Sequence, residues 1–277
     1  MSSCVAALDE LLSRPEGRWT LAEGAVAVAG LGGRRVQAST VEAHLTEMTA
    51  VLRAEVGIAK HPRFAAAGLT RAFFENLAFR VIPSERDDEE LRFIDCALDT
   101  RRATRSLATL LFIDLARRSG VRVEGSALPG RLVLRLSSSG HSVYLDSVTP
   151  FPLLSTDDLE RRTRRATKGR VSFRAAGLAT ISPSQVLARL VQDLKSCCWR
   201  RAKLSHALDA GEMMLTIRPD DPREIRDRGR LLYLLGHHDE AVLQLERYLR
   251  VNPRGDDADA IRRILLEARS ATHSQLS

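Results

Sequence analysis

Apolar residues recur at helical spacing through most of the N-terminal half of the chain. Segments with one apolar face, typical of amphipathic helices packed on a core, cover residues 5–12, 21–29, 41–56, 65–77 and 84–98. The next segment, SLATLLFIDLARR at residues 106–118, is apolar nearly all round. This pattern predicts a central, buried helix.

The pattern then changes to the alternation that is typical of strands. Residues 121–125, RLVLRL (131–136) and SVYLD (142–146) predict three strands, and the polar turn SSSGH joins the last two as a hairpin. One buried helix followed by antiparallel strands predicts an α+β domain. We expect this domain to occupy residues 1–159.

Residues 184–277 carry only helical patterns and predict an all-α domain. Pro219 and Pro253 lie 34 residues apart, which is the tetratricopeptide period, and each proline follows a predicted helix. Residues 185–199 supply the first helix of the first repeat, and residues 257–268 supply a capping helix. Two repeats bury little surface alone, so we expect them to pack on the N-terminal domain or on a partner.

The charge is concentrated between the two predicted domains. The 277 residues include 42 Lys and Arg and 35 Asp and Glu, for a net charge of +7, but residues 161–202 hold 11 basic residues and one acid, Asp193. The densest part is RRTRRATKGRVSFR (161–174), which includes Arg161, Arg162, Arg164 and Arg165. Residues 160–183 are therefore predicted to be a solvated connecting segment, and nucleic-acid or anion binding is the alternative.

Other features exclude several classes of protein. The chain has no apolar run of about 18 residues and no secretory leader pattern, so we expect a cytoplasmic protein without membrane contact. The spacing of Cys4, Cys96, Cys197 and Cys198 fits neither a disulfide framework nor a zinc site, and we expect no metal or cofactor. In GLGGRR (30–35) the third glycine of a dinucleotide loop is replaced by Arg35, which favours a helix end.

Several segments together resemble a known family. FFENLAF, CALDTRRATRSLATLLFIDLARRSGV, LPGRLVLRL, VYLD and IRDRGRLLYLLG follow one another in an order similar to that of the bacterial SirB-type family. This family joins a transglutaminase-like domain to tetratricopeptide repeats, and the resemblance extends over residues 21–268. It implies a papain-like N-terminal domain with a Cys–His–Asp triad.

The triad implied by this resemblance is incomplete. The start of the central helix, where the cysteine is expected, carries Arg105 or Leu107, and the histidine position holds Arg131. Asp146 alone is retained, and we expect it to pair with Arg131 across neighbouring strands. Guanidinium does not act as a base near neutral pH, because it stays protonated. The resemblance therefore implies a protein that is not an enzyme.

We expect a non-catalytic binding or regulatory module whose repeats bind a protein or peptide. The arginines that flank the expected repeat groove could select an acidic partner, although ion pairs with Asp227 and Glu224 are the more ordinary use; they are Arg223, Arg226, Arg228 and Arg230. A second alternative is a diverged hydrolase or transferase with a site rebuilt from Ser106, His141 or Cys96. It requires one of these residues to lie within hydrogen-bond distance of a base.

Overall fold

The computed structural model describes residues 2–57, 61–129, 131–147, 150–171 and 178–275. The N-terminal half contains helices α1 (Ser3–Ser13), α2 (Leu21–Ala29), α3 (Ala38–Val56), α4 (Pro62–Arg71), α5 (Ile94–Thr100) and α6 (Arg105–Arg118). Its strands are β1 (Arg80–Ile82), β2 (Arg102–Thr104), β3 (Val123–Leu128), β4 (Arg131–Ser138), β5 (His141–Asp146) and β6 (Leu153–Leu154). The remaining helices are α7 (Thr156–Ala166), α8 (Pro183–Arg200), α9 (Leu204–Ile217), α10 (Pro222–Leu234), α11 (His238–Val251) and α12 (Ala258–Gln275).

Local sequence explains where several of these helices begin and end. Thr20 and Glu23 form a capping box at the start of α2, and Ser182 with Gln185 forms another at the start of α8. The glycine-rich stretch after α2 is a short 3₁₀ turn in which Gly32 has a φ of 68°. The interpretation of GLGGRR as a helix end is therefore correct, because only a residue without a Cβ adopts this conformation readily.

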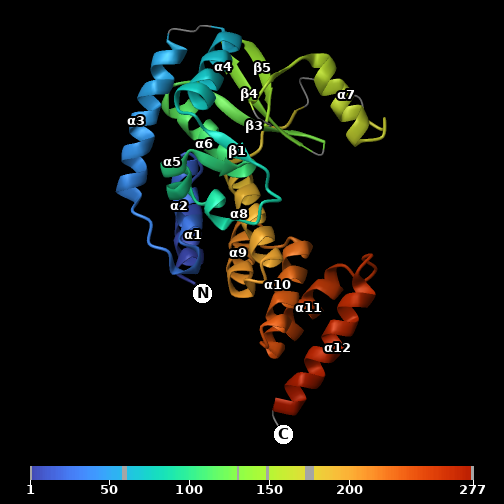
Figure 1. The fold of residues 1–277 in the computed structure, drawn as a ribbon. Coiled ribbons are helices and arrows are strands. Elements are labelled where there is room, and N and C mark those ends of the chain that lie inside the picture. The colour runs from blue at the N-terminus through green and yellow to red at the C-terminus, as the bar shows by residue number, and fades with distance from the viewer. Residues whose placement is uncertain (1, 58–60, 130, 148–149, 172–177, 276–277) are drawn as a thin grey trace.

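The sheet has the antiparallel arrangement that the sequence predicts. β3, β4, β5 and β6 lie in that order, and β1 and β2 form a separate parallel pair immediately before α6. α6 is buried along nearly its whole length and forms the centre of the N-terminal core, with the sheet against it and α3 beyond it (Figure 1). The predicted α+β domain followed by a helical region is thus confirmed.

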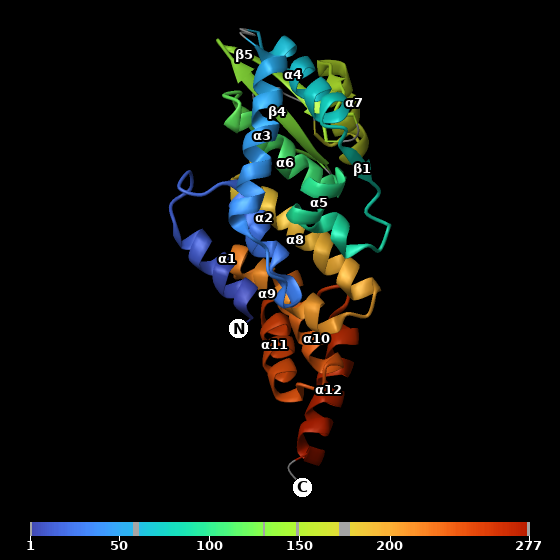
Figure 2. The same ribbon diagram turned by 60° about the vertical axis from the view of Figure 1, so that its left-hand side comes forward.

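The C-terminal helices do not form an independent unit. α8 contacts α2 and α6, and α9 contacts α1, so the first helical pair shares the main hydrophobic core with the N-terminal domain (Figure 2). α10, α11 and α12 extend away from it around a small core of their own, which includes Ile225, Leu245 and Tyr248. The prediction that the repeats pack on the N-terminal domain is confirmed.

Three local features differ from the pattern-based expectations. The helix expected over residues 84–98 is divided into a 3₁₀ turn (Glu89–Arg92) and α5. The strands β1, β2 and β6 are too short to leave a periodic pattern. α7 spans residue 159, where the N-terminal domain was expected to end, because Ser155 and Asp158 form a capping box that starts a helix there.

Among the described residues, no helix combines the length and the apolar character needed to cross a membrane.

Candidate functional site

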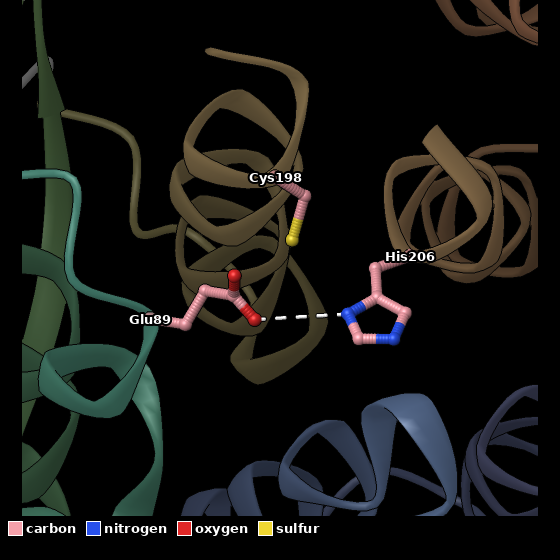
Figure 3. Close-up of side chains that lie close together, drawn as sticks. All are labelled: Glu89, Cys198 and His206. Carbon is pink, nitrogen blue, oxygen red and sulfur yellow. Dashed lines mark ion pairs between the residues drawn. The ribbon is translucent and has the colours of Figure 1, made fainter. Parts of the chain in front are cut away.

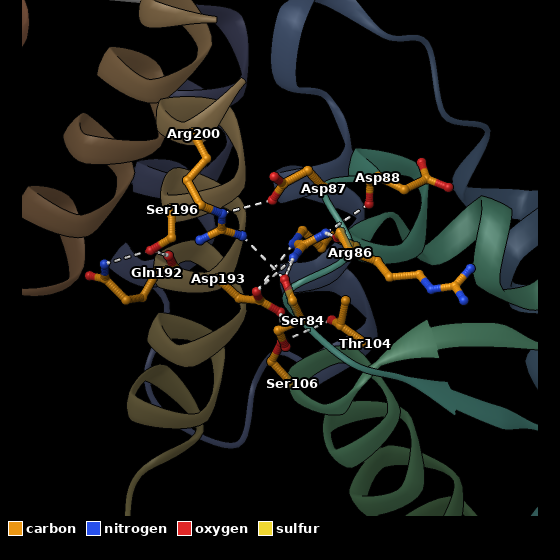
Figure 4. A network of polar contacts seen from close by, with 11 residues as sticks. Ser84, Arg86, Asp87, Asp88, Thr104, Ser106, Gln192, Asp193, Ser196 and Arg200 are labelled. Atoms are coloured by element: carbon orange, nitrogen blue, oxygen red, sulfur yellow. Dashed lines mark hydrogen bonds and ion pairs between the residues drawn. The ribbon is translucent and has the colours of Figure 1, made fainter. Parts of the chain in front are cut away.

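The first turn of α6 occupies the place where the resemblance puts a catalytic cysteine. Thr104 precedes the helix, Arg105 is exposed, Ser106 is half-buried and Leu107 is fully buried. Neither Arg105 nor Leu107 offers a nucleophilic atom. The hydroxyl of Ser106 donates a hydrogen bond to Oδ2 of Asp193 over 2.5 Å, and it lies 3.1 Å from the hydroxyl of Thr104 (Figure 4).

Asp193 is in turn held by a fully buried arginine. The guanidinium of Arg92 donates to Oδ1 of Asp193 over 3.2 Å and to the backbone carbonyls of Ser84, Arg86 and Asp88 over 2.7 to 3.2 Å. The side chains of Arg92 and Asp193 form an ion pair of 3.1 Å. The carboxylate beside Ser106 is therefore already engaged by the guanidinium of Arg92.

An open cleft of about 840 Å³ lies beside this network. Its walls come from the first turn of α6, the loop at residues 84–87, and the facing sides of α8 and α9. The cleft thus lies between the N-terminal domain and the first repeat, at the end of α6 where the resemblance implies a cysteine. Sequence reasoning did not find Arg92 or Asp193, because they approach Ser106 only through the packing of α8 on α6.

Asp146, the retained member of the expected triad, lies at the end of β5 and is fully buried. An oxygen of its carboxylate accepts a hydrogen bond from the guanidinium of Arg162, which belongs to α7. Its backbone is paired with Val133, two residues beyond Arg131 on β4. The side chain of Arg131 lies outside the described part of the structure, and so does the expected Arg131–Asp146 pair.

Cys96 and His141, the other two residues of the rebuilt-site alternative, contact residues other than Ser106 and Asp193. Cys96 of α5 is half-buried beside Arg34, whose guanidinium lies 3.4 Å from its sulfur, and burial raises the pKa of this thiol. His141 is exposed at the start of β5, and its ring centre lies 5.2 Å from that of His61. The described contacts of Ser106 are to Thr104 and Asp193. A carboxylate therefore lies within hydrogen-bond distance of Ser106 in the cleft, which is the geometry that the rebuilt-site alternative requires.

The arginines of α10 differ in how fully they are engaged. Arg226 bonds to Asp257 over 2.6 Å and to Asp227 over 2.7 Å, and Arg228 bonds to Glu212 over 3.1 Å. The Arg230 guanidinium lies over the ring of Trp199, whereas Arg223 is exposed, and within the described ranges its side chain has no ion pair. The expected Arg226–Asp227 pair is present.

Glu224 has a different partner from the one expected. It is buried and accepts a hydrogen bond from Nζ of Lys195 over 2.5 Å, and the same ammonium donates to Asp227 over 2.9 Å. Lys195 lies on α8, so this buried cluster ties the first repeat to the second. The counter-ion of Glu224 is therefore Lys195 and not one of the arginines of α10.

The basic segment is partly helical. In α7, Arg161 pairs with Asp158, Arg162 with Asp146, and Arg164 with Glu160. Arg165 is exposed on the same helix. These pairs reduce the positive charge available to a nucleic acid, while residues 172–177 lie outside the described residues.

Glu89, Cys198 and His206 bring three potential metal-ligand atoms within 4.8 Å of one another (Figure 3). Nδ1 of His206 lies 3.6 Å from Oε2 of Glu89. The other oxygen of this carboxylate lies 2.8 Å from Nζ of Lys203, so Glu89 already has a cationic partner. Burial raises the pKa of Cys198 to about 12, which keeps this thiol protonated at neutral pH.

The fold defines a transglutaminase-like domain that is joined to helical repeats. Residues 39–192 match the family described as the transglutaminase-like superfamily, and residues 194–265 match a tetratricopeptide repeat family. The first match covers more than half of the chain. The protein therefore belongs to the transglutaminase-like superfamily, and the resemblance to its SirB-type members is confirmed by the relatives described next.

The relatives are bacterial proteins of similar length. A UPF0162 protein of Xylella fastidiosa (strain Temecula1 / ATCC 700964) is 24% identical over 204 residues, which is 73% of each chain. Protein SirB1 of Salmonella typhimurium is 25% identical over 175 residues, covering 61% of this chain and 63% of the relative. A crystal structure of menin superposes on 95% of this chain and 68% of its own, with a TM-score of 0.49 and 11% identity.

Proposed function

We propose that this protein is a non-catalytic transglutaminase-like and tetratricopeptide protein, which acts as a protein-binding or regulatory module in the bacterial cytoplasm. The observation that supports this proposal most directly is the environment of Ser106. Its hydroxyl is bonded to Asp193, and Asp193 is bonded to the buried Arg92. Arg105 and Leu107 provide no thiol on either side.

The chemistry of acyl transfer needs a nucleophile and a group that takes its proton. A serine hydroxyl is a weak nucleophile unless a base such as an imidazole activates it. Asp193 is not such an imidazole, and its carboxylate is already paired with the buried guanidinium of Arg92. The site therefore supports binding better than turnover.

Active-site labelling tests the absence of catalysis. The full chain is incubated with a fluorophosphonate probe for activated serines and with an alkylating probe for activated thiols, and labelled peptides are identified by mass spectrometry. We expect no labelling at Ser106 above the level of a Ser106→Ala control. Labelling that Ser106→Ala abolishes would overturn the proposal, because only an activated hydroxyl reacts with a fluorophosphonate.

Tetratricopeptide repeats generally mediate protein–protein interaction, and we infer that a protein or peptide partner binds here on α10. Arg223 is the best site for a test, since its side chain is exposed and, in the described ranges, makes no ion pair that a substitution would break. Arg250 of α11 is an exposed arginine on another helix and provides the matched control.

The partner is sought by cross-linking and mass spectrometry in cell extract treated with nuclease. We expect a discrete protein that is retained by Arg250→Glu and lost by Arg223→Glu. Retention of that protein by both variants would exclude this face of α10 as its binding surface. Recovery of nucleic acid alone from untreated extract would favour the basic segment instead.

A further inference from the structure

The cleft beside α6 has an excess of uncompensated positive charge. Arg105 and Arg189 both line it and are exposed, and among the described residues neither side chain has a hydrogen bond or ion pair. Arg218 also lines the cleft, and in the described part of the chain its one acidic partner is Asp221, at 3.9 Å. Desolvation of the guanidinium by the cleft walls and the charge of Arg218 both lower the pKa of Arg189. Arg189 and Arg218 therefore repel each other beside a space in which an anion would be stabilised.

The acidic residues of the cleft leave this excess largely in place. Asp87 is bonded to Arg200 over 2.7 Å, and Asp193 is bonded to Arg92. Glu85 is exposed on the loop at the rim. Most of the acidic charge is thus already committed to arginines other than the three described above.

The first turn of α6 adds donors of the right kind. The side chain of Thr104 does not cap the backbone of the first turn, and this turn contains no acidic residue but begins with Arg105. The N-terminus of a helix carries partial positive charge and favours anions. A cation in this turn is unfavourable unless a negative group lies nearby. The carboxylate of Asp193, which is bonded to Ser106, is one such negative group. The open cleft has room for a second, which a bound anion would supply.

A second, independent feature is the hydroxyl of Thr109, one helical turn further along α6. Thr109 is 2% exposed and lines the cleft, and its Oγ1 has no hydrogen-bond partner. A buried hydroxyl without a partner costs about 1 to 3 kcal/mol in general. A ligand oxygen that accepted this hydrogen bond would remove the cost.

We propose that the cleft between α6 and α8 binds the phosphate group of a small organic phosphate, through Arg105, Arg189, Arg218 and the hydroxyl of Thr109. The cleft volume lies within the usual range for small-molecule sites, about 300 to 1,000 Å³. A site with several arginines and a helix N-terminus is better suited to a ligand with the two negative charges of a phosphate than to one with a single carboxylate. Leu132, Val186 and Met214 form an apolar part of the lining, which suits the organic part of the ligand.

This inference deepens the proposed function by naming a ligand class for a site that is expected to bind without reacting. Isothermal titration with inorganic phosphate and with phenyl phosphate, at constant ionic strength, separates the two sources of a phosphate group. We expect saturable binding of both, and tighter binding of phenyl phosphate because its ring buries apolar surface. No saturable binding of either at about 1 mM overturns the inference.

Variants identify the groups that bind. Arg189→Gln is expected to weaken phenyl phosphate binding about tenfold or more, since it removes a charge-assisted hydrogen bond. Arg250→Gln, an exposed arginine outside the cleft, should leave affinity unchanged. Equal affinities of wild type and Arg189→Gln would place the ligand elsewhere and overturn the proposal.

Thr109→Val keeps the shape of the side chain and removes only the hydroxyl. We expect about fivefold weaker binding, together with an unliganded stability at least equal to that of wild type, because the lost hydroxyl had no partner. A loss of unliganded stability without a change in affinity would contradict the role of Thr109 in binding.

The same titration keeps the two proposals separate. Absence of binding overturns the phosphate inference but leaves the non-catalytic proposal intact, since that rests on Ser106. Release of phenol from phenyl phosphate would instead overturn the non-catalytic proposal while supporting occupation of the cleft.

Discussion

Ser106 Oγ and Asp193 Oδ2 are 2.5 Å apart although 87 residues separate them in the chain. The bond joins the first turn of the central helix α6 to α8, the first helix of the repeat region. The same carboxylate accepts from the buried Arg92, so one acidic residue links three segments. A position where the family resemblance implies catalysis has thus become part of the interface between the two halves of the molecule.

Removing the charge of Asp193 should destabilise the fold strongly. In Asp193→Asn, the fully buried Arg92 loses its counter-ion, and we expect a loss of about 3 kcal/mol in the free energy of unfolding. Urea unfolding followed by circular dichroism measures this change. Asp87→Asn is the matched control, because its pair with Arg200 is about half exposed and should contribute less than about 1 kcal/mol. Equal losses for the two variants would contradict the structural role of Asp193.

The Lys195 cluster gives a second test of how the repeats are joined. Lys195→Met leaves Glu224 buried without its cationic partner, so we expect a loss of about 3 to 5 kcal/mol in unfolding free energy. Adding Glu224→Leu should recover part of that loss, because Asp227 keeps its bond to Arg226. If the double variant were no more stable than Lys195→Met, the cost would not come from an unpaired Glu224.

Two glycines of the repeat helices should respond oppositely to alanine. A Cβ on Gly229 of α10 would lie 2.6 Å from Cδ2 of Leu245, so Gly229→Ala should cost about 1 to 3 kcal/mol through overpacking. A Cβ on Gly211 of α9 would meet nothing closer than 3.8 Å. Gly211→Ala should gain up to about 1 kcal/mol from helix propensity. Thermal unfolding of both variants checks the difference in sign, and two changes of the same sign would contradict this packing.

Burial of Cys198 predicts a specific pH dependence. Its pKa is about 12 in the folded protein against 9.0 in the unfolded chain. A thiol whose folded pKa is raised contributes stability that is present below the unfolded pKa and is lost as the pH rises toward the folded one. Between pH 9 and 12, this thiol should therefore make stability fall by up to about 1.4 kcal/mol per pH unit.

Urea unfolding at pH 8 and pH 10 measures this slope. Cys198→Ala should shift the free energy of unfolding by a constant packing cost and should lack the extra loss at the higher pH. An identical pH dependence for wild type and variant would show that Cys198 is not withdrawn from water in the folded protein.

The sequence pattern was sufficient for the order and type of the main elements. α6 was identifiable because its side chains are apolar nearly all round, and the repeat region because its prolines recur at a fixed interval. The strands β1, β2 and β6 were not predicted, because they have too few residues to show a periodic pattern. The division of the 84–98 segment depends on Arg92, whose buried guanidinium takes the backbone carbonyls of Ser84, Arg86 and Asp88 as partners.

For the candidate site, the sequence by itself determined which residues stand where the resemblance implies a triad: Arg105 or Leu107 at the start of α6, and Arg131 on β4. The tertiary structure decided what surrounds these positions. Asp193 was visible in the sequence as the one acid in a basic stretch, but its bond to Ser106 exists only because α8 packs on α6. Local side-chain pattern fixes helices and strands over a few residues, whereas a cleft with charged walls arises from contacts between residues far apart in the chain.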